Sequence, residues 1–497
     1  MKRKTVLGLM AGLTMTALLG ACTTATSPAT GRTFTTSLSP QQEAQLGRQE
    51  HPQILAEFGG AYDAQPDLTA YVTSVGQSVA ATAERKDVTY TFTILDTPDV
   101  NAFAVPGGYV YITRGLLALA NNEAEIAGVL GHEIGHINAR HTAERMGQEQ
   151  KAQIGVLGAT LLGAILGGET GANLLGGAVQ QGAQYRLAHY SQEQEFEADS
   201  LGVRYLKRSA YDPQAMATFL ADLRSQSQLE AQLAGQDPNA VDADNMLASH
   251  PRTVDRVQRA IAEAGSEPAA GAKLDADTYL QKIDGLIFGD DPRNGIIDGT
   301  RFIHPSLHFA FTVPQGYKLV NQPDMVGATG PQDAVITFTL ASPQPSGALA
   351  DYIASGQIAQ NVTFQNVQAV TINGMPAATG TAAVNTNKGS RNVRVVLVKH
   401  PEGRVYQFLF FATPNTASSL DSAFLQTAQS FQQIGGDEGA RYRPKRVHIV
   451  TVQEGDTVQS LSARMVTGAN EDWFRVLNNL KPGEEPQVGR KVKIVTY

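Results

Sequence analysis

The residues with the clearest chemistry lie in one short segment, H-E-I-G-H, over residues 132–136. On a helix, His132 and His136 are about 40° apart around the axis and about 6 Å apart along it, so both imidazoles can bind one metal ion. Glu133 points toward the same face and can hold a water molecule on that ion. Because zinc lowers the pKa of such a water to about 7, Glu133 can accept its proton as the water attacks a carbonyl carbon. The segment therefore predicts zinc-dependent hydrolysis.

A third ligand is predicted from a second pair of residues with helical spacing. In one class of zinc peptidase, a glycine and a third histidine follow the second histidine at fixed offsets. Ala139 and Thr142 occupy those offsets and His141 is out of step, which excludes that class. Glu195 and Asp199 share a helical face, so Glu195 can complete a His₂Glu set and Asp199 can accept a hydrogen bond from a ligand histidine. The alternative for this second segment is an ordinary solvated acidic face.

The metal-binding segment is expected to lie in a buried helix. Residues 124–130 carry apolar side chains at helical intervals and lead directly into His132. Residues 121–123, N-N-E, form a helix start with a capping side chain and an acidic first turn.

Three segments in this order resemble a known family of zinc peptidases. Residues 101–117 precede the predicted metal helix, and the acidic segment contains Glu195, Asp199 and Gly202. Together with H-E-I-G-H they resemble the HtpX and CAAX-prenyl-protease type of gluzincin, and within it the soluble BepA-like branch of the bacterial envelope. The resemblance covers about residues 41–265.

The resemblance implies a role for each residue of the site. The implied zinc ligands are His132, His136 and Glu195, with Glu133 as the base and Asp199 as the partner of a ligand histidine. It also implies an edge strand within residues 101–113, which can bind an extended substrate by backbone pairing.

His250 precedes Pro251 and is followed by Arg256, a pattern similar to an element of the BepA-like branch. The resemblance implies that His250 occupies the fourth zinc position at rest and keeps the protease latent. The alternative is an ordinary loop histidine before a proline.

The N-terminus predicts export. Three basic residues at 2–4 precede an apolar run over 6–19, so residues 1–21 are expected to be a signal peptide, too short and wrongly flanked for a stable membrane span.

Cys22 follows L-G-A, which resembles a bacterial lipobox and implies acylation of this cysteine. Cys22 is the only cysteine, so no disulfide can form within one chain. Thr23 in the next position resembles the pattern of outer-membrane sorting, which implies a lipid anchor in the outer membrane, facing the periplasm. Residues 22–40 are rich in Thr, Ser, Ala and Pro and predict a flexible tether.

Length and charge limit the remaining possibilities. A chain of 497 residues is expected to hold about three domains. Its formal charge of −8 becomes more negative by three when the leader is removed, and no broad basic patch is visible. Because phosphate binding needs a basic surface, this charge disfavours nucleic acid, and no nucleic-acid partner is expected.

The predicted fold is multidomain. It comprises a mainly α (α+β) zincin-type metallopeptidase domain over 41–265, a linker over 266–294, an α+β domain over 295–435 and a small βααβ domain over 445–497. In the second domain, strand-like segments alternate with helical patterns at 349–358 and 419–430. This domain is weakly similar to PsbP-like folds, and docking of a substrate or partner is its expected role.

The C-terminal domain resembles a LysM module. The resemblance rests on residues 450–461, 473–480 and 488–495. That family binds N-acetylglucosamine chains, which implies peptidoglycan as a partner here.

A Gly-, Ala- and Leu-rich stretch over 154–179 lies between the ligand segments. Each apolar half is too short to span a bilayer. The stretch is either a buried helical hairpin or a mobile apolar lid, which its glycines would make pliable.

The leading hypothesis is a lipid-anchored zinc endopeptidase, with one zinc ion per chain, that degrades misfolded or misassembled envelope proteins. The first alternative is an outer-membrane protein assembly or chaperone-like binding factor tethered to peptidoglycan. A peptidoglycan-cleaving enzyme is a third hypothesis, suggested by the LysM-like tail alone.

Overall fold

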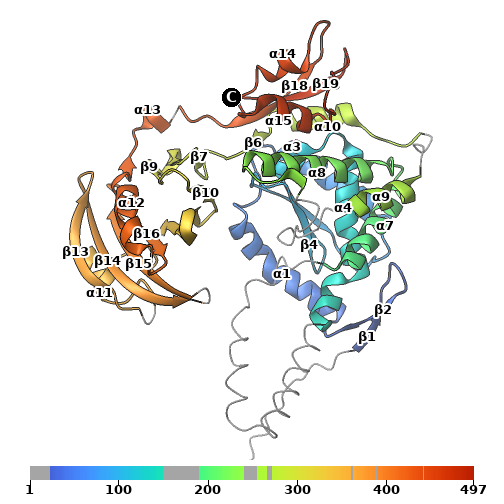
Figure 1. Ribbon diagram of the computed structural model, residues 1–497. Coiled ribbons are helices and arrows are strands. Elements are labelled where there is room, and N and C mark those ends of the chain that lie inside the picture. Colours follow the sequence, from blue (N-terminus) through green and yellow to red (C-terminus); the bar gives the residue numbers. More distant parts are fainter. Residues whose placement is uncertain are drawn as a thin grey trace, which may run out of the picture.

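The computed structural model describes residues 23–148, 190–239, 254–265, 271–359, 362–386, 389–439 and 441–497. The predicted signal peptide, Cys22, the apolar stretch over 154–179 and His250 lie outside these ranges. Three parts are distinct in Figure 1: a helical domain in blue to green, a β-rich domain in yellow to orange and a small C-terminal domain in red.

The helical domain surrounds a small sheet. Its helices are α1 (Pro40–Glu57), α2 (Pro66–Ala80), α3 (Arg114–Leu119), α4 (Glu123–Ala139), α7 (Gln192–Arg208), α8 (Ala215–Leu233) and α9 (Val254–Ala264). Its sheet has the order β3 (Thr91–Leu95), β5 (Tyr109–Thr113), β4 (Ala102–Val105). Strand β5 is parallel to β3 and antiparallel to β4, so β4 is an edge strand, within the range predicted for one.

Helix α4 is the centre of this domain. The side chain of Asn122 caps its first turn by accepting from the backbone N–H of Glu125 at 2.9 Å. Every residue of α4 is buried, in agreement with the predicted buried helix. The helix ends at Arg140, which adopts the left-handed conformation (φ 63°) and whose guanidinium is 3.1 Å from Glu43.

Helices α4 and α7 pack closely because small residues line their contact. A Cβ added to Gly135 would lie 3.2 Å from the carbonyl oxygen of Ala198, and one added to Gly202 would lie 3.2 Å from the backbone nitrogen of His132. This close approach lets short side chains on the two helices meet.

The N-terminal segment differs from the predicted flexible tether. Within residues 22–40, strands β1 (Thr23–Thr26) and β2 (Thr33–Thr36) form an antiparallel hairpin. Threonine is β-branched and favours strands, which the polar composition of the segment concealed. Arg32 in the turn of the hairpin binds Glu144 and Glu197 of the helical domain.

The β-rich domain contains two antiparallel sheets. The larger sheet has the order β10 (Lys318–Asn321), β11 (Met325–Thr329), β12 (Val335–Leu340), β16 (Val405–Ala412), β15 (Gly389–Lys399), β14 (Met375–Thr386), β13 (Gln365–Ile372). The smaller has the order β17 (Gln432–Gln433), β9 (Phe309–Thr312), β8 (Arg301–His304), β7 (Ile296–Asp298). Their shared core is rich in phenylalanine, including Phe338, Phe408 and Phe431.

Two helices accompany these sheets, and both overlap predicted helical segments. Helix α12 (Ala417–Gln429) matches the second segment closely. Helix α11 (Leu349–Ala354) ends four residues before the predicted 358, because Gly356 adopts a positive φ of 76° and stops the helix.

The C-terminal domain has the predicted βααβ order. Its elements are β18 (Lys445–Thr451), α14 (Val458–Ser462), α15 (Asn470–Leu477) and β19 (Lys491–Thr496). A short strand from before the β-rich domain, β6 (Ile287–Phe288), pairs with β18 and extends this sheet. The chain therefore enters and leaves the β-rich domain through two adjacent strands.

The region predicted as a linker over 266–294 contains packed structure. Helix α10 (Ala276–Ile283) buries Tyr279, Leu280 and Ile283 in the core of the helical domain. It also contacts β18 and β19, so it lies between the helical and C-terminal domains (Figure 1).

The C-terminal domain is anchored to the helical domain through a buried lysine. Lys493 on β19 is completely buried, and its ammonium donates to the carbonyl oxygens of Ala118, Leu119 and Ala120 at 3.0, 2.7 and 2.7 Å. Val447 of β18 belongs to the same hydrophobic core as α4. The two domains are thus one packed unit.

In the described part of the chain, no helix combines the length and apolar composition needed to cross a membrane.

Candidate metal centre

The two histidines of α4 and Glu195 of α7 meet inside the helical domain. Nε2 of His132 is 3.0 Å from Nε2 of His136. The carboxylate of Glu195 approaches these atoms at 3.6 Å from His132 and 3.5 Å from His136. All three side chains are buried, and one potential ligand atom from each lies within 4.8 Å of the others. The predicted ligands are therefore together in one group.

This group fits a zinc ion by its chemistry. Two imidazole nitrogens and one carboxylate oxygen are ligand types of catalytic zinc sites, and ligands about 2.0–2.2 Å from a tetrahedral ion are separated by about 3.3–3.6 Å. The measured separations of 3.0–3.6 Å are close to that spacing. When bound there, zinc supplies a Lewis acid that polarises a carbonyl group and acidifies a water molecule.

The other ring nitrogen of His132 faces a carboxylate. Nδ1 of His132 is 2.9 Å from Asp199, one helical turn beyond Glu195 on α7. Arg256 on α9 holds Asp199 through two contacts of 2.7 Å and reaches Glu195 at 2.8 Å. Burial alone would disfavour ionisation of Asp199, but Arg256 and His132 outweigh it and hold the pKa of this carboxyl far below its usual range.

The other ring nitrogen of His136 faces a second histidine. Nδ1 of His136 is 2.8 Å from Nδ1 of His141, and Nε2 of His141 is 3.2 Å from Glu197. The ring of Tyr190 stacks on His136 with 3.9 Å between centroids, and its hydroxyl is 3.0 Å from Thr142. Burial raises the pKa of Tyr190 to about 12.

Glu133 lies between the two histidines on α4 and is 2% exposed. Its charge contributes to raising the pKa values of both Tyr190 and Arg256, which places its carboxylate in the same buried compartment. A carboxylate in this compartment can accept a proton from a water molecule on a metal ion that His132, His136 and Glu195 would hold.

The HExxH and ExxxD segments on crossing helices, with a buried His₂Glu donor group between them, define a zinc metallopeptidase domain. Residues 66–264 match the model of peptidase family M48. Residues 450–495 match the LysM domain, in agreement with the resemblance found in the sequence.

Several characterised proteins are similar over the peptidase region. The chain is 36% identical over 204 residues to the beta-barrel assembly-enhancing protease of Yersinia pestis, covering 40% of this chain and 41% of that protein. Against the protein of the same name in Escherichia coli (strain K12), it is 31% identical over 273 residues, 54% of this chain and 53% of that one. The mitochondrial metalloendopeptidase OMA1 of Schizosaccharomyces pombe is 28% identical over 194 residues, 39% and 55% of the two chains. The matches thus span about half the length of these relatives.

The β-rich domain has PsbP among its structural neighbours. The solution structure of cyanobacterial PsbP from Synechocystis sp. PCC 6803 aligns with 28% of this chain and 95% of that protein, at 15% identity and a TM-score of 0.22.

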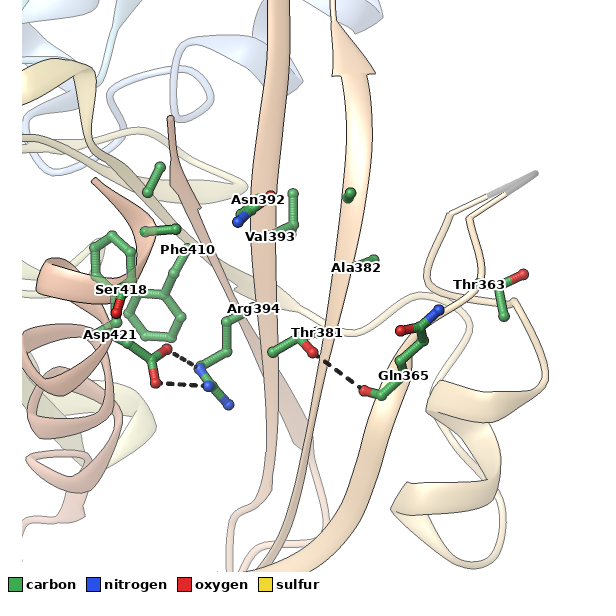
Figure 2. Close-up of a pocket in the computed structure, with 14 residues that line it drawn as sticks. Thr363, Gln365, Thr381, Ala382, Asn392, Val393, Arg394, Phe410, Ser418 and Asp421 are labelled. Carbon is green, nitrogen blue, oxygen red and sulfur yellow. Dashed lines mark hydrogen bonds and ion pairs between the residues drawn. The ribbon is translucent and has the colours of Figure 1, made fainter. Parts of the chain in front are cut away.

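A hollow of about 650 Å³ lies on the β-rich domain, away from the metal centre. Figure 2 shows Arg394 on the sheet facing Asp421 on α12, and Thr381 beside Gln365 of the edge strand. The ion pair between Arg394 and Asp421 measures 2.6 Å. Arg394 is also 3.1 Å from Thr379, so its charge is already engaged within the domain.

Zinc affinity is expected to fall about 10–100-fold when Asp199 is replaced by asparagine, because the charged partner of His132 is lost. The measurement is competition with a chromophoric chelator. Glu193→Gln is the matched control, since Glu193 is exposed on the same helix. Equal zinc affinity in Asp199→Asn and the unchanged protein would contradict the prediction.

Proposed function

We propose that this protein is a zinc-dependent endopeptidase of the bacterial cell envelope that cleaves misfolded or misassembled envelope proteins. The proposal rests on the buried His132, His136 and Glu195 group in a family M48 domain. Its similarity to proteases named for enhancing β-barrel assembly supports an envelope substrate.

In the proposed mechanism, Glu133 takes a proton from the attacking water and returns it to the leaving amine. Asp199 holds His132 in the orientation that directs Nε2 to the metal, and Arg256 fixes Asp199 and Glu195 from the opposite side. The edge strand β4 is the proposed binding site for the backbone of an extended substrate, which favours unfolded proteins over folded ones.

The test is cleavage of an unfolded protein by the zinc-loaded chain beginning at residue 23. Casein and an unfolded outer-membrane protein are expected to be cut, and a compact folded protein to remain intact. If neither unfolded protein is cut by the unchanged chain or by its His250→Ala variant, although one zinc ion is bound per chain, the proposal is contradicted.

His250 is proposed to block the fourth zinc position at rest, on the resemblance of its sequence context. Replacing His250 by alanine is then expected to raise the cleavage rate. A latch that is closed nine times out of ten would give about a tenfold gain. An unchanged rate at unchanged zinc content would show that His250 is not a latch.

The chain is proposed to be lipid-anchored through Cys22 in the outer membrane, facing the periplasm. In cells, the Cys22→Ser variant is expected to leave the outer-membrane fraction. If this variant still fractionates with the outer membrane, another feature of the protein holds it there.

The LysM domain is proposed to bind peptidoglycan. The soluble protein is expected to sediment with purified sacculi, and chitin oligosaccharides are expected to compete. Sedimentation that no glycan displaces would point to a protein partner instead.

A second candidate function is an assembly factor whose β-rich and LysM domains bind envelope proteins while the peptidase is latent. The hollow in Figure 2 is the observation that favours it, because it offers polar side chains and an exposed sheet edge away from the metal centre. Under this alternative, a Glu133→Gln strain would keep a normal envelope, and deletion of residues 290–497 would damage it.

A further inference from the structure

His141 contacts the metal ligand His136 through the ring nitrogen that does not face the other donors. Nδ1 of His136 is 2.8 Å from Nδ1 of His141, while its Nε2 is directed toward His132. His141 is completely buried, and its own Nε2 is 3.2 Å from Glu197 on α7. These three side chains form a continuous line of hydrogen bonds that leads away from the metal centre.

The chemistry of the partners assigns every proton in this line. If Nε2 of His136 binds a metal ion, its Nδ1 carries the proton and must donate. The neighbouring Nδ1 of His141 then has to accept. A neutral imidazole with an unprotonated Nδ1 carries its proton on Nε2, and that N–H points at the carboxylate of Glu197, which can only accept. One tautomer of His141 therefore satisfies both neighbours.

The far end of the line is fixed by the N-terminal hairpin. Glu197 accepts from Nε of Arg32 at 3.1 Å and from the hydroxyl of Thr30. The same guanidinium makes a two-fold contact with Glu144 at 2.7 and 2.6 Å. Arg32 thereby ties α7 to the helical segment that carries His141 and Glu144.

We infer that His141 and Glu197 are positioning residues of the metal centre: they hold His136 in the tautomer and ring orientation that present Nε2 to the metal. The inference rests on the proposed zinc site. It assigns a role to two residues, His141 and Glu197, that are not themselves ligands. Asp199 faces Nδ1 of His132 in the same way, so each histidine ligand has its own acceptor: Asp199 for His132 and His141 for His136.

The test compares zinc affinities, measured by chelator competition, in two variants at position 141. His141→Leu fills the space without an acceptor, and zinc affinity is expected to fall about 10–100-fold. His141→Asn places an amide oxygen near the position of Nδ1, and it is expected to bind zinc almost as tightly as the unchanged protein. The visible spectrum of the cobalt-substituted protein is expected to change in the leucine variant and to be restored in the asparagine variant.

His308→Leu is the matched control, because His308 is exposed on the β-rich domain. If His141→Leu does not fold, the comparison moves to Glu197→Leu against Glu197→Gln, of which glutamine alone keeps an acceptor for His141. Zinc affinity in His141→Leu equal to that of the unchanged protein would overturn the inference, as would a folded asparagine variant no better than leucine. If the unchanged protein bound no zinc, the proposed function itself would fail, whatever the variants did.

Discussion

Replacing Glu133 by glutamine is expected to slow peptide cleavage by about 10²–10⁴-fold, the usual contribution of a general base, while zinc remains bound. Glutamine has the shape of glutamate but cannot accept the proton of the attacking water. Glu133 is outside the ligand group, which consists of His132, His136 and Glu195. The loss should therefore appear in the rate of the chemical step and not in the metal content.

The measurement is single-turnover cleavage of a fluorogenic peptide, with zinc determined on the same samples by mass spectrometry. Glu193→Gln removes an exposed carboxylate one turn before Glu197 on α7 and should leave the rate unchanged. A Glu133→Gln variant that cleaves at the original rate would show that another group accepts the proton. Loss of zinc from the variant would instead place Glu133 among the residues that hold the metal.

The donor group was predictable because each half of it is encoded locally. His132 and His136 are one helical turn apart, as are Glu195 and Asp199, and helical spacing alone brings each pair to one face. The βααβ order of the C-terminal domain was also predicted, since its motifs are local. The family match of residues 66–264 confirms the class of peptidase that these motifs indicated.

The features that the sequence did not predict depend on contacts between segments that are far apart along the chain. His141 was excluded as a third zinc ligand, and nothing in its spacing shows that its other neighbour is Glu197, 56 residues away. The hairpin over residues 23–36 was predicted as a tether because its polar composition says nothing of the partners of Arg32. A buried pair of carboxylates such as Glu195 and Asp199 needs a cation nearby. The sequence alone does not show which arginine or lysine supplies it, and in the structure it is Arg256.

Lys493 also makes contacts that the sequence could not predict, because its three carbonyl acceptors are more than 370 residues away along the chain. Three donated hydrogen bonds require the ammonium form, since a neutral amine has only two N–H groups. Glu125 on α4 and Asp222 on α8 are both buried and favour that charge, while burial opposes it and lowers the pKa of Lys493 to about 7. A single lysine thus joins the LysM domain to the C-terminal end of α3, just before the helix that carries His132 and His136.

Lys493→Met is therefore expected to destabilise the packed unit by about 3–5 kcal/mol, the cost of removing one partner from a buried charge cluster. It removes the three hydrogen bonds to backbone carbonyl oxygens, and it takes a cation away from two buried acidic groups, Glu125 and Asp222. Burial raises the pKa values of both acids, that of Asp222 to about 8. The matched control is Lys491→Met on the same strand. Lys491 pairs with Asp277 at 3.0 Å, but that carboxylate is 78% exposed, and such a surface pair contributes at most about 1 kcal/mol.

The only tryptophan of the chain reports on this junction directly. Trp473 on α15 lies edge-to-face against Phe288 of β6, with 5.6 Å between ring centroids. In Lys493→Met, its emission should shift to longer wavelength at a lower urea concentration than in Lys491→Met. Adding Glu125→Gln to Lys493→Met should recover part of the loss, because it removes a buried acidic group that has lost a nearby cation. If both lysine variants unfold at the same urea concentration, the ammonium group does not hold the domains together, and the apolar contacts of Val447 and its neighbours do.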